Sequence, residues 1–246
     1  QVSRESSLAK MLTTWQAMVD ASDSYTGDRR SVSGLVGGDG LKMRQYAIRG
    51  KAMSGGYVSE VIAEALSMAE SNACMRRIVA APTAGACGVL PAVLLPLCKY
   101  EELNQRQILE ALYVASGIGA VIAYRACIAG AAGGCQAEIG VAVSMASAAL
   151  CSMMTDDPDT IHCAASLGGQ VLMGLLCNPI EGYVQVPCIV RNMAAVPTAV
   201  TCANAALVGM DHIVPLDDVV ALMLAVGEKI RPCDEAGTYI LKKEEE

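Results

Sequence analysis

The apolar residues of this chain recur mostly at intervals of three and four positions, which is the spacing of amphipathic α-helices. The first such segment places Leu8, Met11, Leu12, Trp15 and Met18 on one helical face. No run alternates apolar and polar residues in the way a half-buried strand does. The pattern predicts helices over residues 5–21, 57–73, 88–98, 105–128, 135–155, 159–176, 192–209 and 215–230.

Glycine and proline concentrate between the predicted helices. Residues 31–40, 80–92 and 130–134 are the clearest breaks. Glycine and proline end helices, and glycine lets the backbone come close to a neighbouring group. The chain shows no internal repeat and no low-complexity linker. We therefore expect an all-α fold, a single helical domain over residues 1–246 whose helices are joined by Gly/Pro-rich elbows.

The composition favours tightly packed helices. The 246 residues are 53% hydrophobic, with 23 glycines, one tryptophan and no phenylalanine, and the mean hydropathy is +0.40. A core of small and aliphatic residues lets helix backbones approach closely, whereas a β-sandwich would favour aromatic and β-branched residues. The longest apolar stretches lie at 111–124 and 139–154. We expect both to be buried helices and no membrane as a partner, because the first ends at Arg125 and is shorter than a bilayer span.

The charge and the cysteine count narrow the possible partners and the compartment. The formal charge is −7 and no block of Lys and Arg forms a basic face, so we expect no nucleic-acid partner. Residues 1–30 are polar, carry both signs of charge and contain no secretory signal pattern. Eleven cysteines, an odd number in a chain of this length, indicate thiols in a reducing compartment. We expect the cytoplasm.

Three cysteines lie in unusual settings. Cys135 follows two glycines in GAAGGCQAE, Cys177 precedes Asn-Pro, and Cys188 follows Pro187. A buried cysteine often serves as a small apolar residue, and a thiol in a Gly/Pro-rich segment can also be a metal ligand. The spacing leaves both readings open, and the absence of a C-x-x-C pair argues against a zinc knuckle. We expect simple packing for five others: Cys98, Cys127, Cys151, Cys163 and Cys202.

Three motifs together resemble a known family. They are AAPTAGACGVLPAVL (80–94), GAAGGCQAEIGVAVSMA (130–146) and CNPIEGYVQVPCIVRN (177–192). In this order they are similar to the α subunit, or α domain, of iron–sulfur-dependent bacterial L-serine dehydratase. The similarity extends upstream through RGKAMSG (49–55) and AESNACMRRIVAAPT (69–83), so that it covers most of residues 40–210.

The resemblance implies an all-α protein with a [4Fe–4S] cluster on Cys135, Cys177 and Cys188. Three thiolates leave one iron open, and an open iron can act as a Lewis acid toward L-serine. Loss of water gives aminoacrylate, which becomes pyruvate and ammonia. The implied roles are amino-acid catabolism and gluconeogenesis.

Two cations and one turn are further candidates. Lys51 and Arg191 are candidate catalytic residues that would bind the substrate carboxylate, Arg191 by a bidentate fork. The alternative for each is a solvated or salt-bridged cation. The turn at 82–88 would offer backbone N–H groups to an anion, or it is a plain turn.

No general base is evident in this chain. Glu138 is expected to order the loop after Cys135 or to support the ligands, His162 to be structural and His212 to lie on the surface. The resemblance implies a β subunit with a Ser/His-rich motif that is absent here, and we expect this β chain to complete the site within an oligomer. The end of the chain, KIRPCDEAGTYILKKEEE, departs from the family pattern. Its Cys233 is a possible ligand of the open iron or an ordinary thiol.

Other functions stay open from the sequence. A non-catalytic or regulatory relative would keep the fold, and an iron–sulfur lyase could act on threonine or another β-substituted amino acid. A pyridoxal phosphate enzyme would need a Schiff-base lysine and a phosphate-binding loop, and only Lys51 has a suggestive setting.

Overall fold

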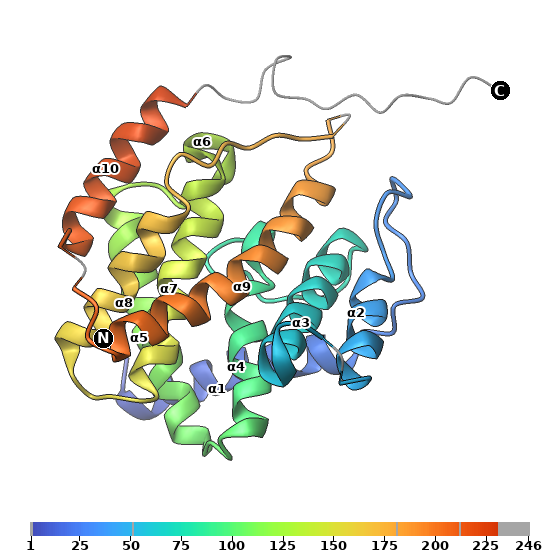
Figure 1. Cartoon of the computed structure of the whole chain (residues 1–246), viewed down its shortest axis with the longest axis horizontal. Helices are drawn as coiled ribbons and strands as arrows, with labels where there is room; N and C mark the ends of the chain where they lie inside the picture. The colour runs from blue at the N-terminus through green and yellow to red at the C-terminus, as the bar shows by residue number, and fades with distance from the viewer. Residues whose placement is uncertain (1, 51, 181, 212, 231–246) are drawn as a thin grey trace.

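The computed structural model describes residues 2–50, 52–180, 182–211 and 213–230 (Figure 1). Within these ranges the chain is helical, and its only β pairing is an isolated bridge between Ile180 and Tyr183. The predicted all-α class is confirmed. The α-helices are α1 (Arg4–Asp23), α2 (Asp39–Ile48), α3 (Gly55–Ala73), α4 (Val89–Tyr100), α5 (Gln105–Arg125), α6 (Gly130–Cys135), α7 (Val141–Ser152), α8 (Pro158–Val171), α9 (Gln185–Leu207) and α10 (Leu216–Lys229). Two short helical turns accompany them, η1 (Ala84–Ala86) and η2 (Gln136–Gly140).

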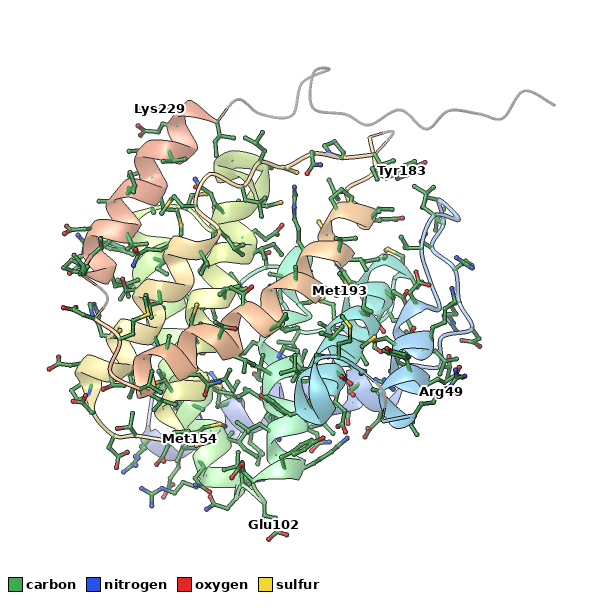
Figure 2. The ribbon with its side chains drawn as sticks, viewed as in Figure 1. Arg49, Glu102, Met154, Tyr183, Met193 and Lys229 are labelled. Carbon is green, nitrogen blue, oxygen red and sulfur yellow. The ribbon has the colours of Figure 1, made fainter. Side chains whose placement is uncertain are left out.

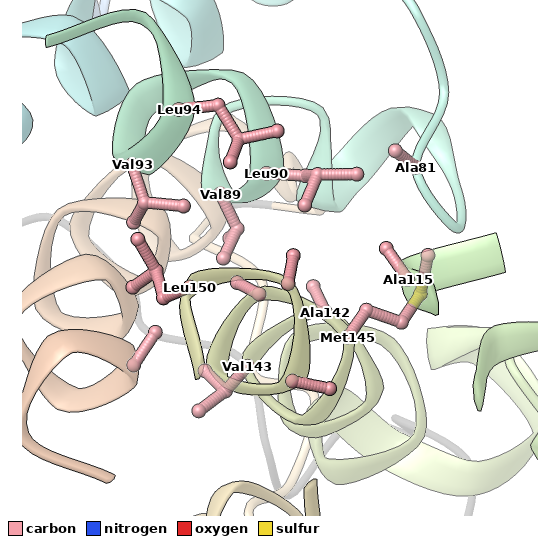
Figure 3. Packing of buried hydrophobic residues seen from close by; sticks show 14 of the residues in the cluster. Ala81, Val89, Leu90, Val93, Leu94, Ala115, Ala142, Val143, Met145 and Leu150 are labelled. Atoms are coloured by element: carbon pink, nitrogen blue, oxygen red, sulfur yellow. The ribbon is translucent and has the colours of Figure 1, made fainter. Parts of the chain in front are cut away.

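Helix α7 is the centre of the hydrophobic core. Every residue from Val141 to Cys151 is buried, and α4, α5, α8 and α9 all pack against this helix. Figure 3 shows Val89 and Val93 of α4 above Ala142 and Met145 of α7. Burial of apolar surface on this scale is the main force that stabilises the bundle.

Small residues bring the helices of this core close together. A Cβ atom at Gly168 of α8 would lie 2.9 Å from the Cα atom of Ser144 on α7. At Gly119 of α5 it would lie 2.8 Å from the Sδ atom of Met145. Both distances are shorter than side-chain carbons normally allow. The close approach predicted from the glycine and alanine content is therefore present in the structure.

Helix α9 connects the part of the molecule that contains α8 with the part that contains α3. It runs diagonally across the view in Figure 1, between α8 and α3. Its Ile189 packs with Leu66 and Ala69 of α3, and Met193 packs against the same small cluster (Figure 2). The first turns of α9 are thus fixed against α3.

Two helices differ from the sequence prediction. Helix α9 begins at Gln185 and not at 192, so that Cys188 and Arg191 lie on its first turns and not in a loop. The sequence also gave no sign of α2. This helix follows the N-cap residue Gly38 (φ 88°), and the backbone N–H groups of Gly38 and Asp39 donate to the buried carboxylate of Glu70, at 3.0 and 2.8 Å. A cap from a residue so distant in sequence leaves no local pattern.

The segment around Cys135 also differs from its prediction. Residues 130–134 form most of helix α6 where a break was expected, and Gly134 (φ 74°) kinks the chain. The η2 segment that follows is a π-turn, so α7 starts only at Val141. π-turns within helices frequently mark functional positions.

By length and hydropathy alone, three helical segments of the described chain would be able to cross a membrane: Gln105–Arg125, Gly130–Ser152 and Gln185–Leu207. The first is 21 residues long. The prediction that its apolar stretch is too short for a bilayer was therefore wrong. The second is buried along 94% of its apolar window, as expected of a core helix. The first is buried along only 39% of its window and is not the fully buried helix that was expected, and the third is likewise 39% buried.

Candidate functional site

A cavity of about 360 Å³ lies between α3, η1, α6, η2 and the start of α9. Cys177, Cys188 and Glu138 line it, together with Gly85 and Gly130. A larger hollow of about 840 Å³ lies between α1 and α5, but no thiol lines it. The smaller cavity is the candidate site because segments distant in sequence bring reactive side chains to it.

Cys135 lies at the end of α6, fully buried, and is linked to the segment that carries Cys177. Arg191 donates a hydrogen bond from Nη1 to the Cys135 Sγ atom at 2.7 Å, and another from Nη2 to Asn178 Oδ1. Burial raises the pKa of the Cys135 thiol, and the guanidinium of Arg191 opposes that shift. Arg191 therefore favours a negatively charged sulfur at Cys135.

Cys188 lies on the first turn of α9, and its environment includes the other two thiols. Burial, together with the charges of Glu138 and Cys177, raises its pKa to about 12. Cys188 in turn raises the pKa of Cys135. Cys135, Cys177 and Cys188, which come from three different segments, are thus close enough for their charges to interact.

These residues fit an iron–sulfur cluster by the chemistry of their donor atoms. Thiolates are the protein ligands that such clusters use, and soft sulfur donors select iron–sulfur centres over hard cations. Among the described residues, no three His, Cys, Asp or Glu side chains converge closely enough to hold a single metal ion. A cubane offers separate iron corners, so its thiolates surround a volume and do not meet at one point.

The other cysteines are placed differently. Of those predicted to serve only in packing, Cys151, Cys163 and Cys202 are buried, while Cys98 and Cys127 are partly exposed. None of these lines the cavity. The ten described cysteines form no disulfide.

Asn192 holds Cys188 beside the 82–88 turn, and sequence reasoning missed it. Its fully buried amide donates from Nδ2 to the carbonyls of Gly85 and Cys188, at 2.6 and 2.7 Å. Its Oδ1 atom accepts from the N–H of Gly88 at 3.0 Å. The only available signal was a polar residue in a mostly apolar helix.

Gln136 fixes the backbone segment that leads to Cys177, as Asn192 fixes the turn beside Cys188. Its buried side chain accepts from the N–H of Gly174 at 2.8 Å and donates to the carbonyl of Met223 at 3.0 Å. Its own N–H donates to the Leu175 carbonyl at 3.0 Å. A Cβ atom at Gly134 would lie 2.8 Å from that same carbonyl oxygen. The segment leading to Cys177 is thereby fixed directly against Cys135.

Glu138 projects from the π-turn η2 to the cavity wall. Its Oε1 atom accepts a hydrogen bond from Thr83 Oγ1. A Cβ atom at Gly85 would lie 2.6 Å from Oε2, and one at Gly130 would lie 2.9 Å from the same atom. Only glycine at these positions lets the carboxylate lie directly against the backbone.

The remaining predicted site residues divide into two groups. Lys51, His212 and Cys233 lie outside the described residues. His162 is partly buried on α8 and is not among the residues that line the cavity.

Three of the six backbone donors of the 82–88 turn are used inside the protein. The N–H groups of Ala86 and Cys87 bond within the turn, and that of Gly88 bonds to Asn192. These contacts favour a structural turn over an anion site.

The fold and this cavity define a helical protein in which Cys177 and Cys188 line a candidate metal site and Cys135 lies beside Cys188. The family model described as serine dehydratase alpha chain matches residues 1–236. The chain belongs to this family.

Similar proteins include the probable L-serine dehydratase, alpha chain, of Bacillus subtilis, which is 37% identical over 80% of this chain and 66% of the relative. The L-serine dehydratase, alpha chain, of Peptoniphilus asaccharolyticus is 40% identical over 80% of this chain and 67% of the relative. L-serine dehydratase 2 of Escherichia coli is 43% identical over 67% of this chain and 36% of the relative. The chain thus spans about two thirds of the separate alpha chains and about a third of the Escherichia coli enzyme.

Proposed function

We propose that this chain is the α chain of an L-serine ammonia-lyase, which converts L-serine to pyruvate and ammonia. The observation that carries the proposal is that Cys177 and Cys188 line one cavity, while buried Cys135 lies close enough to Cys188 for their charges to interact, in a member of the serine dehydratase alpha chain family. The relatives named L-serine dehydratase support the same reaction.

The three cysteines would hold a [4Fe–4S] cluster. When bound, such a cluster with one iron free of protein ligands supplies a Lewis acid that activates the β-hydroxyl of serine as a leaving group. Arg191 favours the thiolate form of Cys135 through the hydrogen bond to Sγ, against the effect of burial on the pKa of that thiol. Asn192 and Gln136 fix the positions of Cys188 and of the Cys177 segment, as supporting residues around metal sites commonly do.

Arg191 has a second contact that bears on its predicted role as a carboxylate ligand. Its two Nη atoms engage Cys135 and Asn178. In our proposal this guanidinium first orders the cluster ligands, and any contact with the substrate carboxylate uses its remaining donors.

A β chain and a cytoplasmic location belong to the same proposal. Relatives named alpha chain imply a separate β chain, which would supply the groups that the described residues lack. Helix α5 exposes Val121 and Tyr124, the latter at 92%, and such apolar side chains suit an interface with a partner chain. Thiol ligands and an open iron both suit the reducing cytoplasm.

The proposal is tested by anaerobic reconstitution with iron and sulfide, followed by pyruvate assays with L-serine and L-threonine, with and without the β chain. We expect a brown protein that forms pyruvate from L-serine once β is added. A colourless chain that stays folded without iron and forms no pyruvate with β would instead identify a non-catalytic relative.

A further inference from the structure

Apart from the two cysteines, Glu138 is the only ionisable side chain among the described residues that line the cavity. The others are apolar or neutral: four alanines, two glycines, Val184, Ile189 and the amides Asn72 and Gln185. A carboxylate on such a wall attracts any cation that enters the cavity.

One oxygen of this carboxylate is engaged and the other is open. Thr83 donates to Oε1, whereas no described residue donates a hydrogen bond to Oε2. The glycines at 85 and 130 place backbone on two sides of the carboxylate and fix its position. A carboxylate that lines the cavity and is held in this way has an acceptor atom left for a ligand there.

We propose that Glu138 binds the α-ammonium group of the substrate and so selects α-amino acids over the corresponding α-hydroxy acids. The inference rests on the proposed function, in which the substrate is an amino acid. An ammonium group has no lone pair, so it cannot ligate iron and must find an acceptor in the protein. Within the described lining, the Oε2 atom of Glu138 is the acceptor with negative charge.

The test compares two ligands that differ only in the group at Cα. L-Alanine carries the ammonium and L-lactate carries a hydroxyl, and neither has a β-hydroxyl to eliminate, so both can be titrated calorimetrically into the anaerobically reconstituted protein. We expect the unmodified chain to bind L-alanine more tightly. In Glu138→Gln the affinity for L-alanine should fall by about tenfold or more, the size expected for loss of a hydrogen bond to a charged group. The affinity for L-lactate should stay unchanged.

Two further variants isolate the charge and its position. Glu110→Gln removes an exposed carboxylate on α5 that pairs with Arg106, and it should leave both affinities unchanged. Gly85→Ala keeps the Glu138 charge but pushes the carboxylate from its place, and it should also weaken L-alanine selectively. Circular dichroism and cluster absorbance would reveal whether Glu138→Gln folds poorly. In that case the Gly85→Ala variant still tests the inference.

Three results would overturn the inference. The first is an unmodified chain that binds L-alanine no more tightly than L-lactate. The second is a parallel loss of both ligands in Glu138→Gln, which would show a purely structural carboxylate. The third is an unchanged L-alanine affinity with a collapse of kcat for L-serine, which would make Glu138 a proton-transfer group. Failure of the proposed function shows separately, as no pyruvate from the unmodified chain with its β chain.

Discussion

The guanidinium of Arg191 donates to the Sγ atom of Cys135 at 2.7 Å, across 56 residues of sequence. The same side chain reaches Asn178, next to Cys177. One residue on α9 therefore orders two of the three segments that carry the candidate cluster ligands.

Replacing this residue should loosen the cluster. Arg191→Lys keeps a positive charge but loses the planar fork that contacts Cys135 and Asn178 together. We expect iron to be released to a chelator about 10- to 100-fold faster, the range seen when groups supporting a metal site are removed. Arg106→Lys, on the exposed face of α5, should show the release rate of the unmodified chain. Equal rates for both variants would contradict a supporting role for Arg191.

Asn192 should be important for stability as well as for the site. Asn192→Ala leaves the buried carbonyls of Gly85 and Cys188 and the N–H of Gly88 without their partner. Buried polar groups without partners cost about 1–3 kcal/mol each, so urea unfolding should show a loss of about 2–4 kcal/mol after local relaxation. The matched change Asn204→Ala, at an exposed position of the same helix, should alter stability by less than about 0.5 kcal/mol. Equal losses for the two would contradict the role given to Asn192.

Gly134 should tolerate no side chain. Its φ of 74° lies in the left-handed region, and an added Cβ would meet the carbonyl oxygen of Leu175 at 2.8 Å. Gly134→Ala should therefore displace the Cys177 segment and lower the iron content after reconstitution, at a cost of about 1–3 kcal/mol in stability. Gly117→Ala, on an open face of α5 with nothing within 4 Å, should leave the iron content unchanged. Full iron loading of Gly134→Ala would show that the kink is dispensable.

The metal-free protein should lose stability in alkali through its packing thiols. Burial raises the pKa of Cys151 and that of Cys202 from 9.0 to about 11. Since the folded-state pKa lies above the unfolded value, this stabilisation is complete below pH 9 and is lost as the pH rises toward 11. Urea unfolding at a series of pH values should show the decline. Cys151→Ser, whose hydroxyl does not titrate in this range, should show a shallower decline, and an identical slope would contradict this origin.

The fold was largely predictable because its helices have a strong local pattern. Apolar spacing located α1, α3 and α10 to within a few residues. The start of α9 and the whole of α2 were missed. Residues distant in sequence fix both, since Glu70 caps α2 and α3 packs on the first turns of α9.

The candidate site was predictable only in part. Motif resemblance singled out Cys135, Cys177 and Cys188, whereas their spacing left packing and ligation both open. The contacts of Arg191 and Asn192 join segments that lie far apart in the chain, so no local sequence pattern predicts them. Glu138 was predicted to order the loop or to support the ligands. Its contact with Thr83 and its position against Gly85 and Gly130 depend on the folded structure and could not be predicted from the sequence.

The central claim is that three thiols hold the cluster, and iron content tests it most directly. Cys135→Ser, Cys177→Ser and Cys188→Ser should each lose the cluster after anaerobic reconstitution, because a serine hydroxyl is a poor ligand for iron–sulfur centres. Cys98→Ser and Cys151→Ser should retain the iron and sulfide of the unmodified chain, with the same absorbance. Full iron content in the Cys135→Ser protein would contradict the account.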